Sequence, residues 1–237
     1  MQQRSKYSFT EGLRDGVPIG LGYLSVAFTI GLMAVRQGLS VAVAVVISAT
    51  NLTSAGQVAG LAVIAAMGSM SEMALTQLVI NLRYALMSIS LSQKLDSAFS
   101  TPKRMLAAFG MTDEIFAVAA SKEGCIGARY MYGLILIPFL GWTLGTLAGA
   151  VAGDFMPASV KAAMGIAIYG MFIAIVLPPA TKSKSIAICT AMAAAASCLM
   201  HYLPVLSGIS DGFVVILCAV AAAGIAAVFW PLREVPA

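Results

Sequence analysis

Long apolar runs alternate along the whole chain with short groups of charged and loop-forming residues. A helix that spans a bilayer needs about 20 residues, because roughly 30 Å of hydrocarbon is crossed at 1.5 Å per residue. Dividing the chain at its charges and loop residues gives candidate segments at 17–35, 39–69, 71–92, 105–120, 129–152, 161–179, 185–203 and 212–231. The pattern predicts an all-α, polytopic membrane bundle of about six to eight spanning segments, in a single transmembrane domain over residues 1–237.

Two of these segments differ from an ordinary spanning helix. Segment 39–69 is too long and has a polar stretch, 51–57, in its middle, while segment 105–120 is short and contains Asp113 and Glu114. Lipid cannot bond to irregular backbone, so such segments must face protein or a water-filled cavity. Broken helices near the bilayer midplane are a recurrent binding element of secondary transporters. We therefore expect two broken or re-entrant segments, and a binding function for them.

The positive charges indicate an orientation, since cytoplasmic loops are enriched in Lys and Arg. In the first arrangement, residues 1–16 are a cytoplasmic N-terminal segment and both irregular segments return to the side they entered. Arg36 and Lys161 are then the only Lys or Arg residues outside, and Arg83 lies within the membrane. If both segments cross instead, the 93–104 loop carries its three positive charges outside. The first arrangement is favoured.

Composition excludes most soluble classes. Of 237 residues, 60% are apolar or aromatic and 10% are charged, whereas a soluble domain has about 25% charged residues. The net charge of +4 is scattered, so no nucleic-acid partner is expected. The four cysteines form no CxxC pair, and neither a P-loop pattern nor an HExxH motif occurs. We therefore expect no metal site, no cofactor and no enzymatic activity.

Glycines recur every fourth residue in several places. They stand at positions 12, 16 and 20, at 56 and 60, and at 141, 145, 149 and 153. A helix face without side chains lets another helix approach closely. The rows predict tight helix packing, and a sliding contact between two bundles is the alternative.

Arg83 lies near the middle of a predicted span, where a charge costs at least about 2.5 kcal/mol. Glu72 is on the same stripe of that helix but roughly 16 Å away along the axis, so the two cannot pair. Asp113 or Glu114 is the expected partner. Such a pair either clips two elements together or borders a cavity that receives an amino acid. Glu72 itself is expected to be an interfacial carboxylate at a helix start, and Trp142 an interface anchor.

Polar residues in the irregular segments and beside Arg83 complete the set of candidate substrate-binding residues. This set is Asn51, Ser54, Gly56, Gln57, Asn81, Arg83, Thr112, Asp113 and Glu114. The residues around Gly56 fit either a ligand lining or a satisfied turn. Burial opposes a charge on Asp113 and Glu114 whereas a nearby guanidinium favours it, so both are also candidates for proton coupling.

A series of short motifs follows along most of the chain. They are Glu11-Gly12-Leu13-Arg14-Asp15-Gly16-Val17-Pro18-Ile19-Gly20, Ser54-Ala55-Gly56-Gln57, Asn81-Leu82-Arg83-Tyr84-Ala85-Leu86-Met87-Ser88, Thr112-Asp113-Glu114, Gly141-Trp142-x-x-Gly145-Thr146-x-x-Gly149 and Met171-Phe172-Ile173-Ala174. In this order they resemble the AzlC family of branched-chain amino acid permeases. The stretch from Asn51 to Thr53 departs from the more aromatic one expected there, so the pocket is expected to differ.

The resemblance implies a multi-pass permease of the bacterial inner membrane that exports leucine, isoleucine, valine and close analogues. It also implies a small AzlD-like membrane subunit as partner. The alternatives are a transporter of another amino acid or small organic solute, and a non-transporting membrane scaffold subunit.

Overall fold

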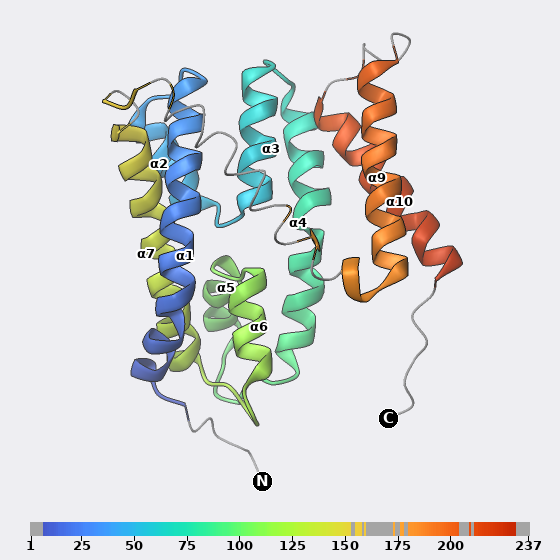
Figure 1. Ribbon diagram of the computed structural model, residues 1–237. Helices are drawn as coiled ribbons and strands as arrows, with labels where there is room; N and C mark the ends of the chain where they lie inside the picture. The colour runs from blue at the N-terminus through green and yellow to red at the C-terminus, as the bar shows by residue number, and fades with distance from the viewer. Residues whose placement is uncertain are drawn as a thin grey trace. The chain divides into compact units, whose positions relative to one another are not determined.

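The computed structural model of the chain describes residues 7–152, 180–203 and 211–230, together with the isolated residues 155–157, 159, 173, 176, 177 and 209. The regular elements within these residues are helices (Figure 1). They are α1 (Phe9–Arg36), α2 (Val41–Thr50), α3 (Ser54–Ala65), α4 (Met70–Ser92), α5 (Thr101–Phe109), α6 (Asp113–Ser121), α7 (Ala128–Ala152), α9 (Lys184–Tyr202) and α10 (Asp211–Phe229).

Five of the described helices are long and apolar enough to cross a membrane, namely α1, α4, α7, α9 and α10. Their bounds agree closely with the predicted segments, except at the start of α1. The prediction of an all-α, multi-pass membrane bundle is therefore confirmed. The predicted span over 161–179 and most of the motif at 171–174 lie outside the described residues.

The chain forms two compact units. Unit 1 contains residues 1–57 and 81–165, and unit 2 contains residues 58–80 and 166–237. Helix α3 passes from unit 1 to unit 2 and helix α4 passes back. A single transport domain can comprise more than one compact unit, so the prediction of one domain over 1–237 stays a prediction.

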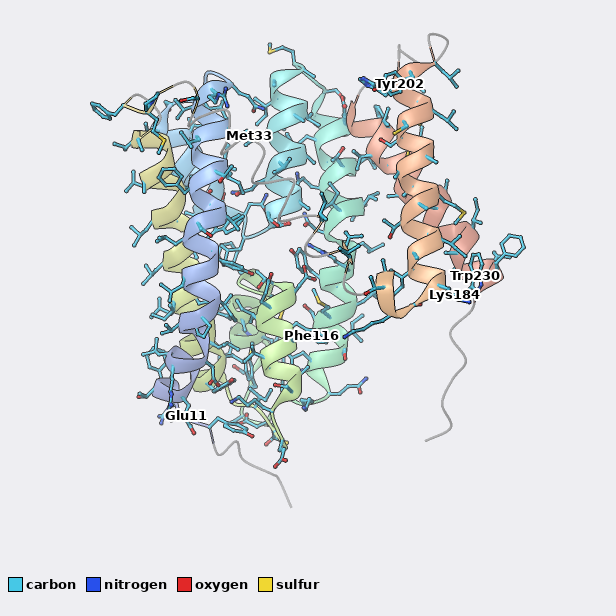
Figure 2. The ribbon with its side chains drawn as sticks, viewed as in Figure 1. Glu11, Met33, Phe116, Lys184, Tyr202 and Trp230 are labelled. Carbon is cyan, nitrogen blue, oxygen red and sulfur yellow. The ribbon has the colours of Figure 1, made fainter. Side chains whose placement is uncertain are left out.

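Helix α1 begins earlier than its apolar run because its first turn is capped. Ser8 Oγ accepts a hydrogen bond from Glu11 N at 3.2 Å, and Glu11 Oε2 accepts one from Ser8 N at 2.6 Å. This reciprocal arrangement is a capping box, which satisfies N–H groups that the first turn leaves free. The helix therefore includes residues 9–16, which the apolar pattern had assigned to an N-terminal segment, and Figure 2 shows Glu11 and Met33 near its opposite ends.

Helices α1 and α7 form the centre of unit 1, and their glycines fit them together. A Cβ atom on Gly16 would lie 2.8 Å from the Leu134 carbonyl oxygen, and one on Gly145 would lie 2.5 Å from that of Leu24. Because the contacts advance in the same direction along both chains, the two helices are parallel. The prediction of close packing at the glycine rows is confirmed for this pair, and Gly153 lies outside the described residues.

Both irregular segments are broken, as predicted. Residues 51–53 separate α2 from α3, and residues 110–112 separate α5 from α6. With 10, 12, 9 and 9 residues, these four helices are too short to span a bilayer.

The α5–α6 segment returns to the end of unit 1 from which it starts. Asp96 N donates to the Ile126 carbonyl at 3.0 Å, and Ile126 N donates to the Lys94 carbonyl at 2.8 Å. The Lys94 ammonium also donates to the carbonyls of Ala120 and Lys122, at 2.5 and 2.6 Å. Because the strand-like stretch before α5 is bonded to the stretch after α6, segment 105–120 is re-entrant. The corresponding return of segment 39–69 involves both units and stays a prediction.

The half-helices of unit 1 occupy opposite halves of the α1–α7 pair (Figure 1). The α5–α6 segment packs beside the N-terminal halves, where a Cβ on Gly110 would overlap the Ile135 side chain. Helix α2 packs beside the C-terminal halves, where Ser48 contacts Thr146. The two breaks therefore lie toward the middle of the pair.

Unit 2 is described by α9 and α10, which pack together, and by the adjoining parts of α3 and α4. Cys218 Sγ on α10 lies 3.6 Å from Met200 Sδ on α9. Glu72 is in the first turn of α4, as expected, but its side chain is buried. The start of α10 covers it, since Gly212 N donates to Glu72 Oε1 at 3.1 Å, and its position at the membrane interface stays a prediction.

Candidate substrate site

The break between α5 and α6 is organised by Thr112, which caps the N-terminus of α6. Its Oγ1 accepts a hydrogen bond from Ile115 N at 3.4 Å and lies 2.6 Å from the Tyr23 hydroxyl oxygen, which can accept the Thr112 hydroxyl proton. The same Tyr23 hydroxyl donates a short hydrogen bond to Glu114 Oε2. Tyr23 therefore connects the middle of α1 to the first turn of α6, where the helix dipole favours negative charge.

Arg83 forms an ion pair with Asp113. The distance between Arg83 Nη1 and Asp113 Oδ2 is 2.9 Å, and this confirms one of the two partners expected for the arginine. Arg83 Nη2 also donates to the Tyr84 hydroxyl at 3.1 Å, and the guanidinium lies over the Tyr84 ring at 4.9 Å from its centroid. These contacts hold the guanidinium beside α6.

The ion pair remains accessible. The side chains of Arg83 and Asp113 are 42% and 44% exposed. Charges at membrane depth face a cavity or another protein surface rather than lipid. Neither side chain of this pair is therefore enclosed by the described part of the chain.

The break between α2 and α3 carries a different group of polar side chains. Gln57 Nε2 donates to Ser48 Oγ at 3.0 Å, and Ser48 Oγ lies 2.7 Å from Thr146 Oγ1. All three residues are buried. Thr53 caps the first turn of α3, with its Oγ1 accepting from Gly56 N at 3.2 Å. The hydrogen bonds of Gln57 and Thr53 fit a satisfied turn, and the alternative of a ligand lining at Asn51 and Ser54 stays a prediction.

Helix α7 places the two breaks at similar depth. Trp142, which packs on Tyr23, and Thr146, which bonds to Ser48, are four residues apart on this helix. At 1.5 Å per residue, their axial separation is about 6 Å. Both lie near the middle of the 25-residue helix α7, so the two breaks occur near the midplane of the span.

Tyr23 and Trp142 belong to the site, although the residue pattern did not indicate them. Their rings meet edge to face with centroids 5.2 Å apart. Trp142 is 2% exposed, so the expectation of an interface anchor was wrong: its helix face is covered by α1. Its indole Nε1 has no hydrogen-bond partner within the part of the chain that the structure describes. An aromatic residue with a polar tip in the middle of an apolar run was the available sequence signal for both residues.

The remaining candidate residues, Asn51, Ser54 and Asn81, lie near the α2–α3 break or near Arg83 in the chain. Asn51 ends α2 in an extended conformation, and Ser54 begins α3. Asn81 is half-buried on α4, two residues before Arg83. The structure thus brings Arg83, Thr112, Asp113 and Glu114 together, and places Gln57 in the separate Ser48–Thr146 group.

Comparison with known proteins identifies the family. Residues 18–156 match the family described as "AzlC protein". The chain belongs to the AzlC family. AzlC proteins are transporters rather than enzymes, and the match covers α2 to α7 and most of α1, and so includes both breaks.

This AzlC protein is similar to several curated proteins. It is 32% identical over 216 residues to "Inner membrane protein YgaZ" of Escherichia coli (strain K12), a match that covers 86% of this chain and 88% of the relative. It is 31% identical to an "Uncharacterized membrane protein" of Archaeoglobus fulgidus, over 72% of this chain and 75% of the relative. A protein of Helicobacter pylori (strain 26695) with the same description is 28% identical, over 62% and 67%. No solved structure matches the chain significantly.

Proposed function

We propose that this AzlC protein is a secondary transporter that exports branched-chain amino acids, with Arg83 and the start of α6 as its binding site for the charged end of the substrate. The accessible Arg83–Asp113 pair at a mid-span helix break is the observation that carries the proposal. Family membership supports an amino acid as the substrate class.

An amino acid has the two charges that this site can receive. Its carboxylate would pair with Arg83 in two parallel hydrogen bonds, and its ammonium would pair with Asp113 or Glu114. The unpaired Nε1 of Trp142 offers a further donor, since a buried donor without an acceptor costs about 1–3 kcal/mol. Asn51 and Ser54, which lie at the α2–α3 break outside the buried Gln57–Ser48–Thr146 group, would line the other side of the pocket.

Asp113 and Glu114 are also proposed to couple transport to protons. When the substrate carboxylate takes Arg83 and its ammonium pairs with Glu114, Asp113 loses its cation, and burial then favours uptake of a proton by Asp113. Asp113→Asn or Glu114→Gln should then abolish net pH-driven flux and largely preserve substrate exchange. Joint loss of exchange and net flux would indicate a binding or folding role, and an unchanged pH dependence of the flux would contradict the coupling.

The charges of unit 1 support a cytoplasmic N-terminus in the bacterial inner membrane. Its Lys and Arg residues gather where α1 and α7 begin and where the α5–α6 segment starts and ends. Six of the eight described ones lie there, namely Arg14, Lys94, Lys103, Arg104, Lys122 and Arg129, while Arg83 lies at mid-span. Arg36 lies at the opposite end of α1. By the positive-inside rule, the first of these ends is the cytoplasmic one.

A small AzlD-like membrane protein is the proposed partner. Family membership supports this partner. Co-expression followed by extraction in mild detergent should give a complex that co-purifies and elutes as one species. Independent elution of the two proteins would contradict the partnership.

Counterflow of labelled leucine in proteoliposomes tests the transport function. Vesicles preloaded with unlabelled leucine should accumulate the label, with and without the small partner measured in parallel. Competition by valine and isoleucine, but not by lysine or glutamate, would establish the substrate class. Exchange of a different solute would favour another amino acid or organic substrate, and absence of exchange for any solute would favour a scaffold subunit.

A further inference from the structure

Unit 2 contains a buried carboxylate that the proposed substrate site does not use. Glu72 on α4 is 3% exposed. Its Oε1 accepts the hydrogen bond from Gly212 N at the start of α10, from 140 residues further along the chain. Glu72 N donates to Ser69 Oγ at 3.1 Å, which places the residue in the first turn of α4.

The side chains that contact Glu72 provide no positive charge. Within the described residues, salt bridges join Arg83 to Asp113 and Lys122 to Asp15, and Glu72 takes part in none. Its neighbours are Gly68 after α3 and Gly212 on α10, and Thr76 on α4 lies beside the same Gly212. Asp211, whose side chain is outside the description, precedes Gly212. Lys182, Lys184 and His201 are on or next to α9 and form no ion pair with Glu72.

An unused hydroxyl lies beside this carboxylate. Thr76 is 0% exposed, and its Oγ1 has no hydrogen-bond partner in the described part of the chain. A Cβ on Gly212 would lie 2.6 Å from Glu72 Oε1 and 2.8 Å from Thr76 Oγ1. The two oxygens therefore border the same small space, which exists because residue 212 has no side chain.

We propose that Glu72 is a proton-binding site of the carrier. An ionised carboxylate in this position would be a buried charge without a counter-charge among the described residues, which is costly in a membrane. A proton removes that cost, and the Thr76 hydroxyl oxygen supplies the acceptor that a protonated carboxyl needs. A hydronium ion from one side of the membrane gives its proton to Glu72, which forms the O–H bond and leaves water; on the other side that bond breaks and the proton passes to water as hydronium.

The coupling part of this inference rests on the proposed transport function, whereas proton binding by Glu72 does not. Infrared spectroscopy of the full-length protein in lipid vesicles tests proton binding directly. The wild type should show the C=O stretching band of a protonated Glu72 carboxyl, and Glu72→Gln should lack it. Glu11→Gln, which changes an exposed carboxylate at the start of α1, is the control and should keep the band. Persistence of the band in Glu72→Gln would overturn the proposal.

Two glycine variants test the geometry on one helix. Gly212→Ala would place a methyl group between Glu72 and Thr76 and should shift or remove the band, whereas Gly224→Ala, which meets no atom within 4 Å, should leave it unchanged. Thr76→Val keeps the shape of the side chain but removes the acceptor, so the band should move to the frequency of a carboxyl with a weaker hydrogen bond. An unchanged band in both Gly212→Ala and Thr76→Val would contradict the proposed site.

Flux measurements test the coupling. In Glu72→Gln, net leucine flux driven by a pH gradient should fall by at least about tenfold, because the linked proton is lost. Leucine exchange should stay within about twofold of the wild type, because exchange needs no change in protonation. Retained pH-driven flux, or loss of exchange in a folded protein, would overturn the coupling role. If the wild type moves no leucine at all, the proposed function fails, while the infrared result still decides whether Glu72 binds a proton.

Discussion

The two helix breaks of unit 1 lie at similar depth along α7 but differ in chemistry. The α2–α3 break is closed by neutral side chains that satisfy one another, Gln57, Ser48 and Thr146, all buried. The α5–α6 break presents an ion pair, Arg83 and Asp113, of which more than two fifths of each side chain is exposed. The same interruption of a helix can therefore seal a membrane protein or open it to a charged ligand. Whether a break is sealed or accessible depends on the side chains nearest its free backbone groups.

The largest effect is expected from a change that disturbs the helix pair supporting both breaks. In Gly145→Ala the new methyl carbon would lie 2.5 Å from the Leu24 carbonyl oxygen and 3.0 Å from the Ala27 Cβ. Overpacking of this kind costs about 1–3 kcal/mol or more, so the yield of folded protein and its melting temperature in detergent should fall. Gly22→Ala, with open space around it, is the control. Normal stability of Gly145→Ala would show that α1 and α7 do not need this contact.

Arg83→Lys tests whether the charged α5–α6 break binds the substrate. Lysine keeps the charge but loses the planar fork that binds a carboxylate through two hydrogen bonds. Leucine affinity in counterflow should fall by about tenfold to a hundredfold, equivalent to 1.4–2.8 kcal/mol. Protein yield should be unchanged. Arg129→Lys, at an exposed position at the start of α7, is the matched control. Loss of yield with normal affinity in the surviving protein would mean that the ion pair is structural.

Gln57→Leu, at the neutral α2–α3 break, is expected to lower stability and leave substrate affinity unchanged. Removal of the amide breaks its hydrogen bond to the buried Ser48 hydroxyl, so stability should decrease by about 1–3 kcal/mol. Thermal unfolding in detergent measures this, with the exposed Gln93→Leu as the control. Leucine affinity should remain near that of the wild type. A large change in affinity would place Gln57 in the binding site and remove the contrast between the two breaks.

Tyr23→Phe is expected to have the smallest effect. The variant keeps the ring contact with Trp142 but loses the hydrogen bonds to Thr112 and Glu114. Leucine affinity should decrease by about threefold to tenfold, since a hydrogen bond contributes about 0.5–1.5 kcal/mol. Tyr132→Phe, which removes a hydrogen bond to the Lys103 carbonyl, is the control. A change as large as that of Arg83→Lys would indicate that Tyr23 contacts the substrate itself.

The long helices and the two breaks could be predicted from local patterns. Apolar runs of about 20 residues have few alternatives in a membrane, and the polar residues at 51–57 and at 112–114 are incompatible with lipid. Close packing of α1 and α7 could also be predicted locally, because glycines at every fourth position show in the sequence that one helix face has no side chains. Among the five long helices, the start of α1 was the boundary predicted wrongly. The Ser8–Glu11 capping box lies in a polar stretch, and the prediction used apolar residues alone.

The candidate site was predicted less completely, because its partners come from distant parts of the chain. That Arg83 needed a carboxylate followed from the cost of burying its charge. The choice of Asp113 over Glu114 depended on where α6 begins and on Tyr23, which binds Glu114 from α1. Trp142 was assigned to the membrane interface because its burial depends on the fit of α1 against α7.

The sequence by itself determined that this protein is a membrane bundle with two interrupted segments and a charged residue at mid-span. These properties follow from the solubility of each residue type in hydrocarbon, which acts on every segment separately. The tertiary structure alone decided which break is closed and which is accessible, and that Glu72 is buried beneath the start of α10. Hydrogen bonds and burial depend on residues up to 140 positions apart, and no local pattern contains that information.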